Sequence, residues 1–489
     1  MKTLLDTNYL PYLQLLDHFY RKSANGSIRY FSKELNLERR TIIKLVENLN
    51  QDIIENNWEN MLSIELNEGE ITATIGSLFS LNVFYSYYMS ISFSVEVVLY
   101  IFQHPNATLE EILDYFYISQ ATFYRRIPPL KKVLLDFNLE LNFANKHFTL
   151  QGDEKQVRYF FFILFWENLH SFPPNLICLS TEDQKYLTYF NTRYQVPIPL
   201  TEIIEIHLGI SLFRVKQGFT LSEFPLHLVP LVYCSRIEFK EHFQAFFKNE
   251  TLSEDQLTIE LRLLYFSFAT ATVYSPSVAT NIPLYEIPWS FPAVPHIHKW
   301  VNYYTSFFNI PLSNEDYIYL LLNLYVIHLK FQVWSGGSLS VGINTVEEIL
   351  HHDNPYILMQ TNLFFDFLNQ QEEEFHLTAF QKMTYALLIR RLIGNSKPAL
   401  HILICSKVGQ EENEWLAYNM LKISTIPIHI HTIWNPNLDL IITDHALSVT
   451  LIPENLDHYF MWSPFPQPLE WAKLLQRLEK LYYGKCFSS

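Results

Sequence analysis

Residues 108–150 read TLEEILDYFYISQATFYRRIPPLKKVLLDFNLELNFANKHFTL, and this stretch decides the fold. Thr108-Leu109-Glu110-Glu111 fits a capping box, which predicts a short helix that ends near Tyr117. Ser119 can cap a second helix. The apolar positions of that helix recur at helical spacing and are Phe123, Ile127, Leu130 and Leu134. Two short helices joined by a tight turn form a helix-turn-helix.

A β-hairpin follows these two helices. Pro128-Pro129 interrupts the second helix, which predicts a kink or a division into two shorter helices. Beyond it the apolar residues alternate, first at Leu139, Leu141 and Phe143 and then at Phe148 and Leu150. A helix-turn-helix followed by a hairpin is a winged helix, and its predicted wing tip carries Lys146 and His147.

The polar face of the second helix supplies the candidate DNA contacts, because the second helix of such a unit reads the major groove. Arginine can bind guanine in bidentate fashion, whereas lysine mainly neutralises phosphate. The candidates are Ser119, Gln120, Thr122, Tyr124, Arg125 and Arg126, with Lys146 from the wing. The alternative interpretation is a helical packing domain with a solvated face.

Residues 27–56, SIRYFSKELNLERRTIIKLVENLNQDIIEN, predict a second helix-turn-helix. Ser27 is a good N-cap, and Asn36-Leu37 predicts the turn. The second helix of this pair buries Ile42, Leu45, Val46, Leu49 and Ile53. Its candidate DNA-binding residues are Arg39, Arg40, Thr41 and Lys44. An ordinary helical hairpin is the alternative here.

Composition predicts a large, mainly helical, multidomain protein. The chain has 489 residues, of which 49% are hydrophobic, so several cores can be buried and the composition disfavours disorder. Only 12 residues are glycine, which disfavours glycine-rich phosphate loops. The net charge of −15 lies mainly in the C-terminal two-thirds, and a DNA-binding surface requires only a local basic face.

Other protein classes fit the sequence poorly. The four cysteines are far apart and no Cys/His metal spacing occurs, which favours a reducing cytoplasm and no metal site. The N-terminus lacks a secretory pattern. Residues 78–102 are apolar enough to suggest a membrane span, but Asn82 and several serines favour a buried helical core. No catalytic triad spacing is found, so we expect a cytoplasmic protein that is neither an enzyme nor cofactor-dependent.

Residues 160–395 predict two helical modules separated by a proline-rich linker at Pro276–Pro295. His207-Leu208-Gly209-Ile210-Ser211-Leu212-Phe213-Arg214, followed by Gly218, resembles the first helix of a phosphotransferase-system (PTS) regulation domain (PRD). His328-Leu329-Lys330-Phe331 resembles the same helix in a second copy, with Ser335 at the arginine position. The resemblance implies phosphorylation of His207 and His328, with His227 and His298 as weaker candidates. A histidine packed in a core is the alternative.

Residues 399–489 predict a small α/β domain with a parallel sheet, because short apolar strands alternate with helices. This region resembles a phosphotransferase-system enzyme IIB (EIIB) domain, with Cys405 directly after the first strand. The loop Ser406–Glu412 lacks a cradle of small residues and contains two acids, which oppose phosphate binding. We therefore expect a degenerate domain that mediates dimerisation.

This order of domains resembles the Mga/AtxA family of PRD-containing bacterial virulence regulators. The resemblance implies a homodimeric DNA-binding activator of virulence or carbohydrate-linked genes, with a PTS phosphocarrier as phosphate donor and Asp6–Arg21 as a further DNA-contacting segment. The alternative is a PTS-responsive RNA-binding antiterminator. The predicted domains are a helix-turn-helix domain at 1–60, a winged helix-turn-helix domain at 61–158, PRD-like domains at 159–282 and 283–396, and an EIIB-like domain at 397–489.

Overall fold

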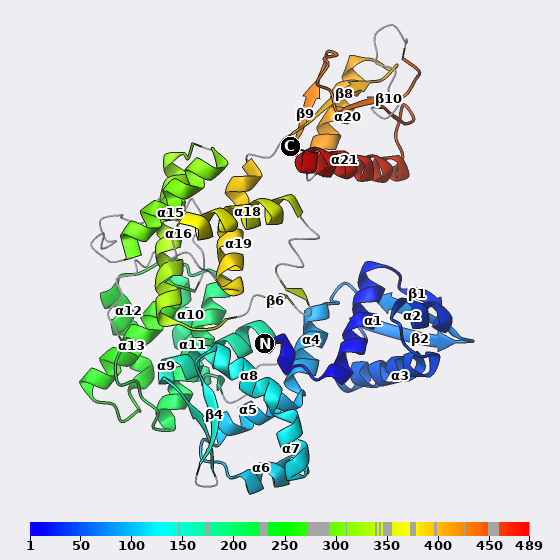
Figure 1. The fold of residues 1–489 in the computed structure, drawn as a ribbon. Coiled ribbons are helices and arrows are strands. Elements are labelled where there is room, and N and C mark those ends of the chain that lie inside the picture. Colours follow the sequence, from blue (N-terminus) through cyan, green and yellow to red (C-terminus); the bar gives the residue numbers. More distant parts are fainter. Residues whose placement is uncertain are drawn as a thin grey trace. The chain divides into compact units, whose positions relative to one another are not determined.

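The computed structural model describes a mainly helical chain that divides into two compact units (Figure 1). The larger unit comprises Met1–Ile349 and His376–Tyr385, and the smaller one Leu350–Phe375 and Ala386–Ser489. The described residues are 1–144, 147–171, 177–224, 233–271, 293–309, 311–337, 340–341, 344–345, 355–371, 378–395, 399–424, 426–447 and 459–488. The predicted linker at 276–295 therefore lies almost entirely outside the described residues, and Lys146 and His227 lie wholly outside them.

The chain begins with a winged helix, here called the first winged unit (residues 10–75). Two short 3-10 helices precede it, η1 (Lys2–Leu4) and η2 (Thr7–Tyr9). Its elements are α1 (Leu10–Arg21), β1 (Asn25–Ser27), α2 (Ile28–Glu34), α3 (Arg39–Glu55), β2 (Leu62–Asn67) and β3 (Glu70–Ile75). The strands form an antiparallel sheet in the order β1-β3-β2, so this sheet crosses the predicted boundary between residues 60 and 61.

The second winged unit (residues 93–151) has the same kinds of element. It is preceded by α4 (Leu81–Ser90). The unit contains α5 (Phe93–Gln103), α6 (Leu109–Tyr115), α7 (Gln120–Arg126), α8 (Pro128–Asp136), β4 (Glu140–Ala144) and β5 (His147–Gln151). Helices α4 and α5 bury most of their aromatic and branched residues in the core, as the sequence predicted for residues 78–102. Within the described ranges, none of the helices combines the length and apolar character that a bilayer span requires.

Helices continue through the rest of the larger unit, here called the central helices. They are α9 (Glu154–Ile163), the π-helical turn η3 (Leu164–Asn168), α10 (Thr181–Tyr194), α11 (Ile198–Lys216), α12 (Arg236–Phe243), η5 (Gln244–Phe247), α13 (Glu254–Ala269), α15 (Ala293–Phe308) and α16 (Asn314–Val333). A short hairpin, β6 (Ser340–Val341) and β7 (Asn344–Thr345), follows. Helix α11 packs against α9 and α13, and α15 packs against α16.

The smaller unit contains the predicted parallel sheet. Its elements are α18 (Pro355–Gln371), most of α19 (Ala379–Asn395), β8 (Leu400–Cys405), α20 (Gln410–Ile423), β9 (Ile428–His431), β10 (Leu440–Thr443), β11 (Tyr459–Met461) and α21 (Pro468–Ser488). All strand pairs are parallel, in the order β11-β10-β8-β9. Alternate residues Leu400, Ile402 and Ile404 form a core with α20 and α21.

Candidate nucleic-acid interface

Helix α3 of the first winged unit presents an open basic surface. Ser27 caps α2 by accepting a hydrogen bond from the Tyr30 backbone N–H at 3.1 Å, and Asn36 makes the turn with a left-handed φ of 52°. The predicted apolar face of α3 is buried, from Ile42 to Ile53. The four predicted contact residues all lie on the exposed side, at Arg39, Arg40, Thr41 and Lys44.

The ion pairs of this unit lie away from that surface. Among the described residues they join Arg21 to Asp17 and Lys22 to Glu34. Among the residues that the structure describes, the guanidinium and ammonium groups at the start of α3 therefore have no carboxylate partner. An exposed helix that begins with such cations can contact phosphates and base edges in a major groove.

A hairpin that was not predicted from the sequence completes the first winged unit. Strands β2 and β3 pair from Leu62↔Ile75 to Asn67↔Glu70. The turn between them is Glu68-Gly69, with φ values of 50° and 86°, which fits a two-residue hairpin loop that needs positive φ twice. Glu68 and Glu70 are exposed, so the tip of this wing is acidic. Alternating apolar residues in Leu62–Leu66 and Ile71–Ile75 were the available signal.

The second helix-turn-helix repeats the geometry of the first. Thr108 and Glu111 form the predicted capping box, and the hydroxyl of Ser119 accepts the Thr122 backbone N–H at 3.2 Å. The turn passes through Tyr117, whose φ is 50° and whose side chain is exposed. Side chains predicted to contact DNA are exposed at Ser119, Gln120, Tyr124 and Arg125, whereas Thr122 is half-buried.

The proline pair divides the recognition helix into α7 and α8, and helical hydrogen bonds continue across the junction. Helix α7 ends at Arg126 and α8 begins at Pro128, as one of the two predicted outcomes. Ile127 keeps a helical conformation and connects the two through hydrogen bonds from its N–H to Phe123 and from Lys131 to its own carbonyl. The apolar face therefore continues, and Phe123, Leu130 and Leu134 are all fully buried.

Arg126 makes contacts within the protein. Its Nη2 lies 2.7 Å from Oδ2 of Asp6, and its guanidinium stacks 4.0 Å above the ring of Phe93. The same Asp6 oxygen accepts the Phe93 backbone N–H at 3.2 Å. Arg126 thus fastens the N-terminal segment to the second winged unit, and it is less open to DNA than Arg125. Its pairing with a residue 120 positions away left no local signal in the sequence.

The second wing is anchored to the chain segment that precedes α6. Strands β4 and β5 pair from Glu140↔Gln151 to Ala144↔His147, as predicted. His147 lies close to Asn106, with its Nδ1 2.6 Å from that carbonyl oxygen, and it also bridges Thr108. The predicted contact at Lys146 lies outside the described residues. His147, which was predicted at the wing tip, therefore also attaches the wing to the segment before α6.

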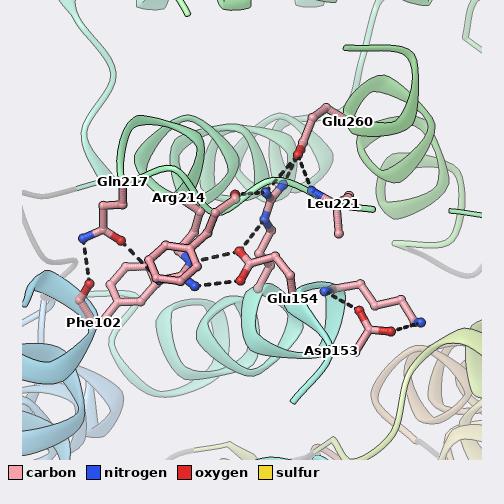
Figure 2. Close-up of polar contacts among 10 residues, drawn as sticks. Phe102, Asp153, Glu154, Arg214, Gln217, Leu221 and Glu260 are labelled. Atoms are coloured by element: carbon pink, nitrogen blue, oxygen red, sulfur yellow. Dashed lines mark hydrogen bonds and ion pairs between the residues drawn. The ribbon is translucent and has the colours of Figure 1, made fainter. Parts of the chain in front are cut away.

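A mostly buried ionic network joins three of the central helices, α9, α11 and α13, directly after the second winged unit (Figure 2). We define this ionic network as Glu154, Arg158, Arg214 and Glu260. Arg158 donates to both oxygens of Glu260, and its Nε donates to Glu154 at 3.0 Å. Arg214 donates to both oxygens of Glu154, at 2.9 and 2.6 Å. Side-chain exposure is 2% for Arg158 and 0% for Glu260. Loss of either charge would therefore leave the other one buried without its partner, which is strongly destabilising.

Gln217 joins this network to α5 of the second winged unit. Arg214 donates to Oε1 of Gln217 at 3.2 Å, and Nε2 of Gln217 donates to the Phe102 and Gln103 carbonyls at 3.0 and 3.1 Å. The guanidinium of Arg214 also lies over the Phe219 ring. Helix α11, which carries the predicted histidine motif, is therefore linked through hydrogen bonds of Gln217 to α5 of the second winged unit. This link was not predicted from the sequence.

The two predicted phosphorylation sites differ in accessibility. His207 is buried on α11, where its ring stacks on Phe162 with a centroid distance of 3.9 Å. Burial, and then the nearby charge of Lys330, lower the pKa of His207 to about 3. His328 on α16 is half-buried, with Nε2 3.0 Å from the hydroxyl of Tyr385. Both rings are neutral at neutral pH, and the side chain of His328 is less buried than that of His207.

The weaker histidine candidate His298 lies near Tyr317, with 3.2 Å between Nδ1 of His298 and the hydroxyl of Tyr317.

The main candidate His328 is neutral as well. Burial and the charge of His296 lower the pKa of His328 to about 4. A neutral imidazole is the form that accepts a phosphoryl group. The protonation states therefore agree with the predicted chemistry, whereas the burial of His207 opposes direct contact with a phosphate donor.

The loop after Cys405 holds an internal carboxylate. Asp444 accepts hydrogen bonds from the Ser406 hydroxyl at 2.6 Å and from the Lys407 backbone N–H at 2.9 Å. Nδ1 of His445 lies 2.7 Å from the same carboxylate. Burial, and then the charge of Asp444, raise the pKa of the Cys405 thiol. The donors that could receive a phosphate thus already bind an anion, and the thiolate is disfavoured.

Part of the chain matches a known protein family. Residues 77–165 match the family model described as the Mga helix-turn-helix domain. This range contains α4, the second winged unit and all of α9. No curated protein matches the chain.

Proposed function

From the premise that this chain is a member of the Mga/AtxA family, we propose that it is a homodimeric activator of transcription controlled by PTS-dependent histidine phosphorylation. The Mga helix-turn-helix domain indicates a DNA-binding transcription regulator. The observation that carries the proposal is the repeated geometry: the first winged unit, with exposed cations at the start of its recognition helix, precedes the matched domain, which contains the second winged unit. Virulence or carbohydrate-linked genes are the proposed targets.

Each winged unit is proposed to place its recognition helix in a major groove. In the first unit the base and phosphate contacts come from Arg39, Arg40, Thr41 and Lys44. In the second unit Arg125 leads, supported by Ser119, Gln120, Thr122 and Tyr124. Arg126 joins them only if its pair with Asp6 opens. Lys146 of the second wing is proposed as a phosphate contact.

His328 is proposed as the main phosphorylation site, since its ring is half-buried and neutral. His207 requires α11 to move before a donor can reach it. Phosphorylation adds roughly two negative charges. At α11 these charges would arise next to the ionic network that leads to α5, which supports a role for His207 in signal transfer. The test is phosphorylation by a PTS phosphocarrier, with His328→Ala expected to remove most of the label.

The smaller unit is proposed to mediate dimerisation. Trp415 and Tyr418 lie one turn apart on α20 and are 54% and 57% exposed, and Leu421 is 52% exposed. Exposed apolar groups gathered on one helix favour a protein–protein contact. Truncation near residue 395 should convert the dimer to a monomer in light scattering. We further propose that the chain has no enzymatic activity, supported by the raised pKa of Cys405 and the carboxylate in its loop.

The experiment that tests the proposal is genome-wide mapping of the DNA bound by the full chain, followed by binding of the recovered duplexes to purified protein. We expect discrete promoter sites and saturable duplex binding that weakens with salt. The alternative function, an RNA-binding antiterminator, predicts that leader RNA competes better than the duplex. Such a result would overturn the proposal.

A further inference from the structure

The central helices contain a pocket that lies outside the regions proposed for DNA binding and phosphorylation. It has a volume of about 210 Å³ and lies between α12 and α13. Its walls are mainly apolar and include Phe239, Leu261, Tyr265 and Phe224. For comparison, dry cavities of roughly 150 Å³ admit benzene. The pocket is therefore large enough for an aromatic ring or a short branched chain.

Three cationic side chains line the same pocket. Arg236 and Lys240 are one turn apart on α12, and Arg262 belongs to α13. None of the lining residues is an aspartate or glutamate, and the ion pairs among the described residues do not include these three cations. The guanidinium of Arg236 lies 5.4 Å from the centre of the Tyr265 ring. Three cations without a carboxylate are a local exception in a chain with a net charge of −15.

Charge and polarity together define the occupant. Inorganic phosphate would satisfy the cations but leave the aromatic walls in water, and a neutral apolar molecule would leave the cations without an anion. Ligand pockets combine apolar walls with a few polar groups that fix the orientation. We propose that this pocket binds a small amphipathic organic anion, with an aryl or branched alkyl group against Leu261 and Tyr265 and a carboxylate facing Lys240 and Arg262.

The position of the pocket connects it to the ionic network. Leu261 and Arg262 directly follow Glu260 on α13, and Glu260 pairs with Arg158. Glu260 also accepts the Leu221 backbone N–H at 3.1 Å, three residues before the pocket residue Phe224. A ligand that contacts Leu261 would therefore touch the residue that directly follows the buried Glu260 in the sequence of α13.

Isothermal titration calorimetry on the full chain tests the proposal with three probes that share one apolar group. They are 4-phenylbutyrate, 4-phenylbutanol and 4-phenylbutylamine. We expect saturable binding of the carboxylate at one site per chain, weaker binding of the alcohol and no saturable binding of the amine. Equal binding of the carboxylate and the amine, or no saturable binding of the carboxylate, would overturn the proposal.

Two variants locate the site. Lys240→Gln combined with Arg262→Gln should weaken carboxylate binding at least about tenfold and leave alcohol binding unchanged, because only the charged partners are lost. Thr258→Trp places a large ring at a lining position and should abolish binding of both. Lys185→Gln, an exposed cation on α10, is the matched control. If the double charge variant folds and binds 4-phenylbutyrate as the wild type does, the assignment is wrong.

Discussion

Both winged units combine a helix-turn-helix with a β-hairpin, but they differ in what holds their recognition helices. In the first winged unit, Arg39, Arg40 and Lys44 are exposed, and the wing tip is acidic at Glu68 and Glu70. In the second, Arg126 pairs with Asp6, and α5 receives hydrogen bonds from Gln217 of the central helices. The first winged unit thus presents exposed cations on its recognition helix, whereas the second winged unit is held by contacts with the N-terminal segment and with the central helices.

The difference teaches that charge on a recognition helix has two uses. A cation that binds DNA must stay accessible, whereas a cation that pairs with a carboxylate positions a segment of the chain. Arg125 and Arg126 are neighbours in sequence, yet only Arg126 has an acidic partner among the described residues. We therefore expect substitutions in the first unit to affect DNA affinity, and substitutions around the second to affect its anchoring as well.

The largest expected effect is loss of the buried charge of Glu260. Glu260→Gln removes the main partner of Arg158 and should cost about 3 kcal/mol of local stability. Hydrogen exchange should accelerate in α9, α11, α13 and α5 and stay unchanged in α1–α3. Glu254→Gln, at the exposed start of the same helix, is the control. Equal acceleration in α3 would contradict the separation between the two units.

The next effect concerns DNA affinity. Arg39→Ala combined with Arg40→Ala should weaken duplex binding roughly 100-fold, since a good bidentate contact contributes about 1–3 kcal/mol. Arg125→Ala should weaken it roughly tenfold, and both changes should reduce the salt dependence. Fluorescence anisotropy at several salt concentrations measures both quantities. Lys185→Ala controls for net charge, and wild-type affinity in the double variant would remove the proposed surface.

Acid should loosen the central helices that support the second winged unit. The folded-state pKa of His207 is about 3, whereas an unfolded histidine titrates near 6.5. Between these values the unfolded state binds more protons, so stability falls as the pH drops below about 6.5. At pH 5 the loss from His207 is about 2 kcal/mol.

His207→Gln should make this pH dependence less steep in urea unfolding monitored between pH 7 and pH 5, while the part that comes from His328, whose pKa is lowered to about 4, remains. His170→Gln changes an exposed histidine and should leave the dependence intact. An equally steep pH profile in His207→Gln would refute the assignment to this buried ring.

A smaller effect is expected for the anchor of the second unit. Both members of the Asp6–Arg126 pair are partly exposed, so their coupling should be about 0.5–1 kcal/mol in a double-mutant cycle of Asp6→Ala and Arg126→Ala. Arg125→Ala should show no coupling to Asp6. Zero coupling for Arg126 would mean that the pair does not hold the N-terminal segment.

The smallest effect should come from the acidic wing of the first unit. Glu68→Gln combined with Glu70→Gln removes two negative charges beside the proposed duplex and should raise affinity about twofold at low salt. Anisotropy titration measures it, with Glu254→Gln as the control. A lower affinity would indicate that these carboxylates support the bound state.

Local features of this fold could be predicted from the sequence because they depend on nearby residues. Ser27, Thr108 and Ser119 cap helices where predicted, and the apolar period locates the buried faces of α3 and α7–α8. The parallel sheet followed from the apolar runs around Leu400–Cys405. The first wing was missed although alternation on both sides of Glu68-Gly69 was present in the sequence.

Long-range pairings could not be predicted in the same way. The contacts of Asp6 with Arg126 and of Arg158 with Glu260 depend on how helices pack, and no spacing rule connects such distant residues. The degree of burial could not be predicted either. His207 and His328 occupy similar motifs, but the ring of His207 is buried against Phe162, whereas His328 is partly exposed and lies beside the hydroxyl of Tyr385. Helical period alone does not distinguish these environments.

Hydroxyl-radical footprinting of the full chain on a bound promoter duplex tests the central claim most directly, namely that both winged units hold DNA. Each chain should protect two segments of the duplex. Arg39→Ala with Arg40→Ala should remove one of them, and Arg125→Ala should weaken the other. A single protected segment that persists unchanged in the Arg39→Ala, Arg40→Ala variant would contradict it.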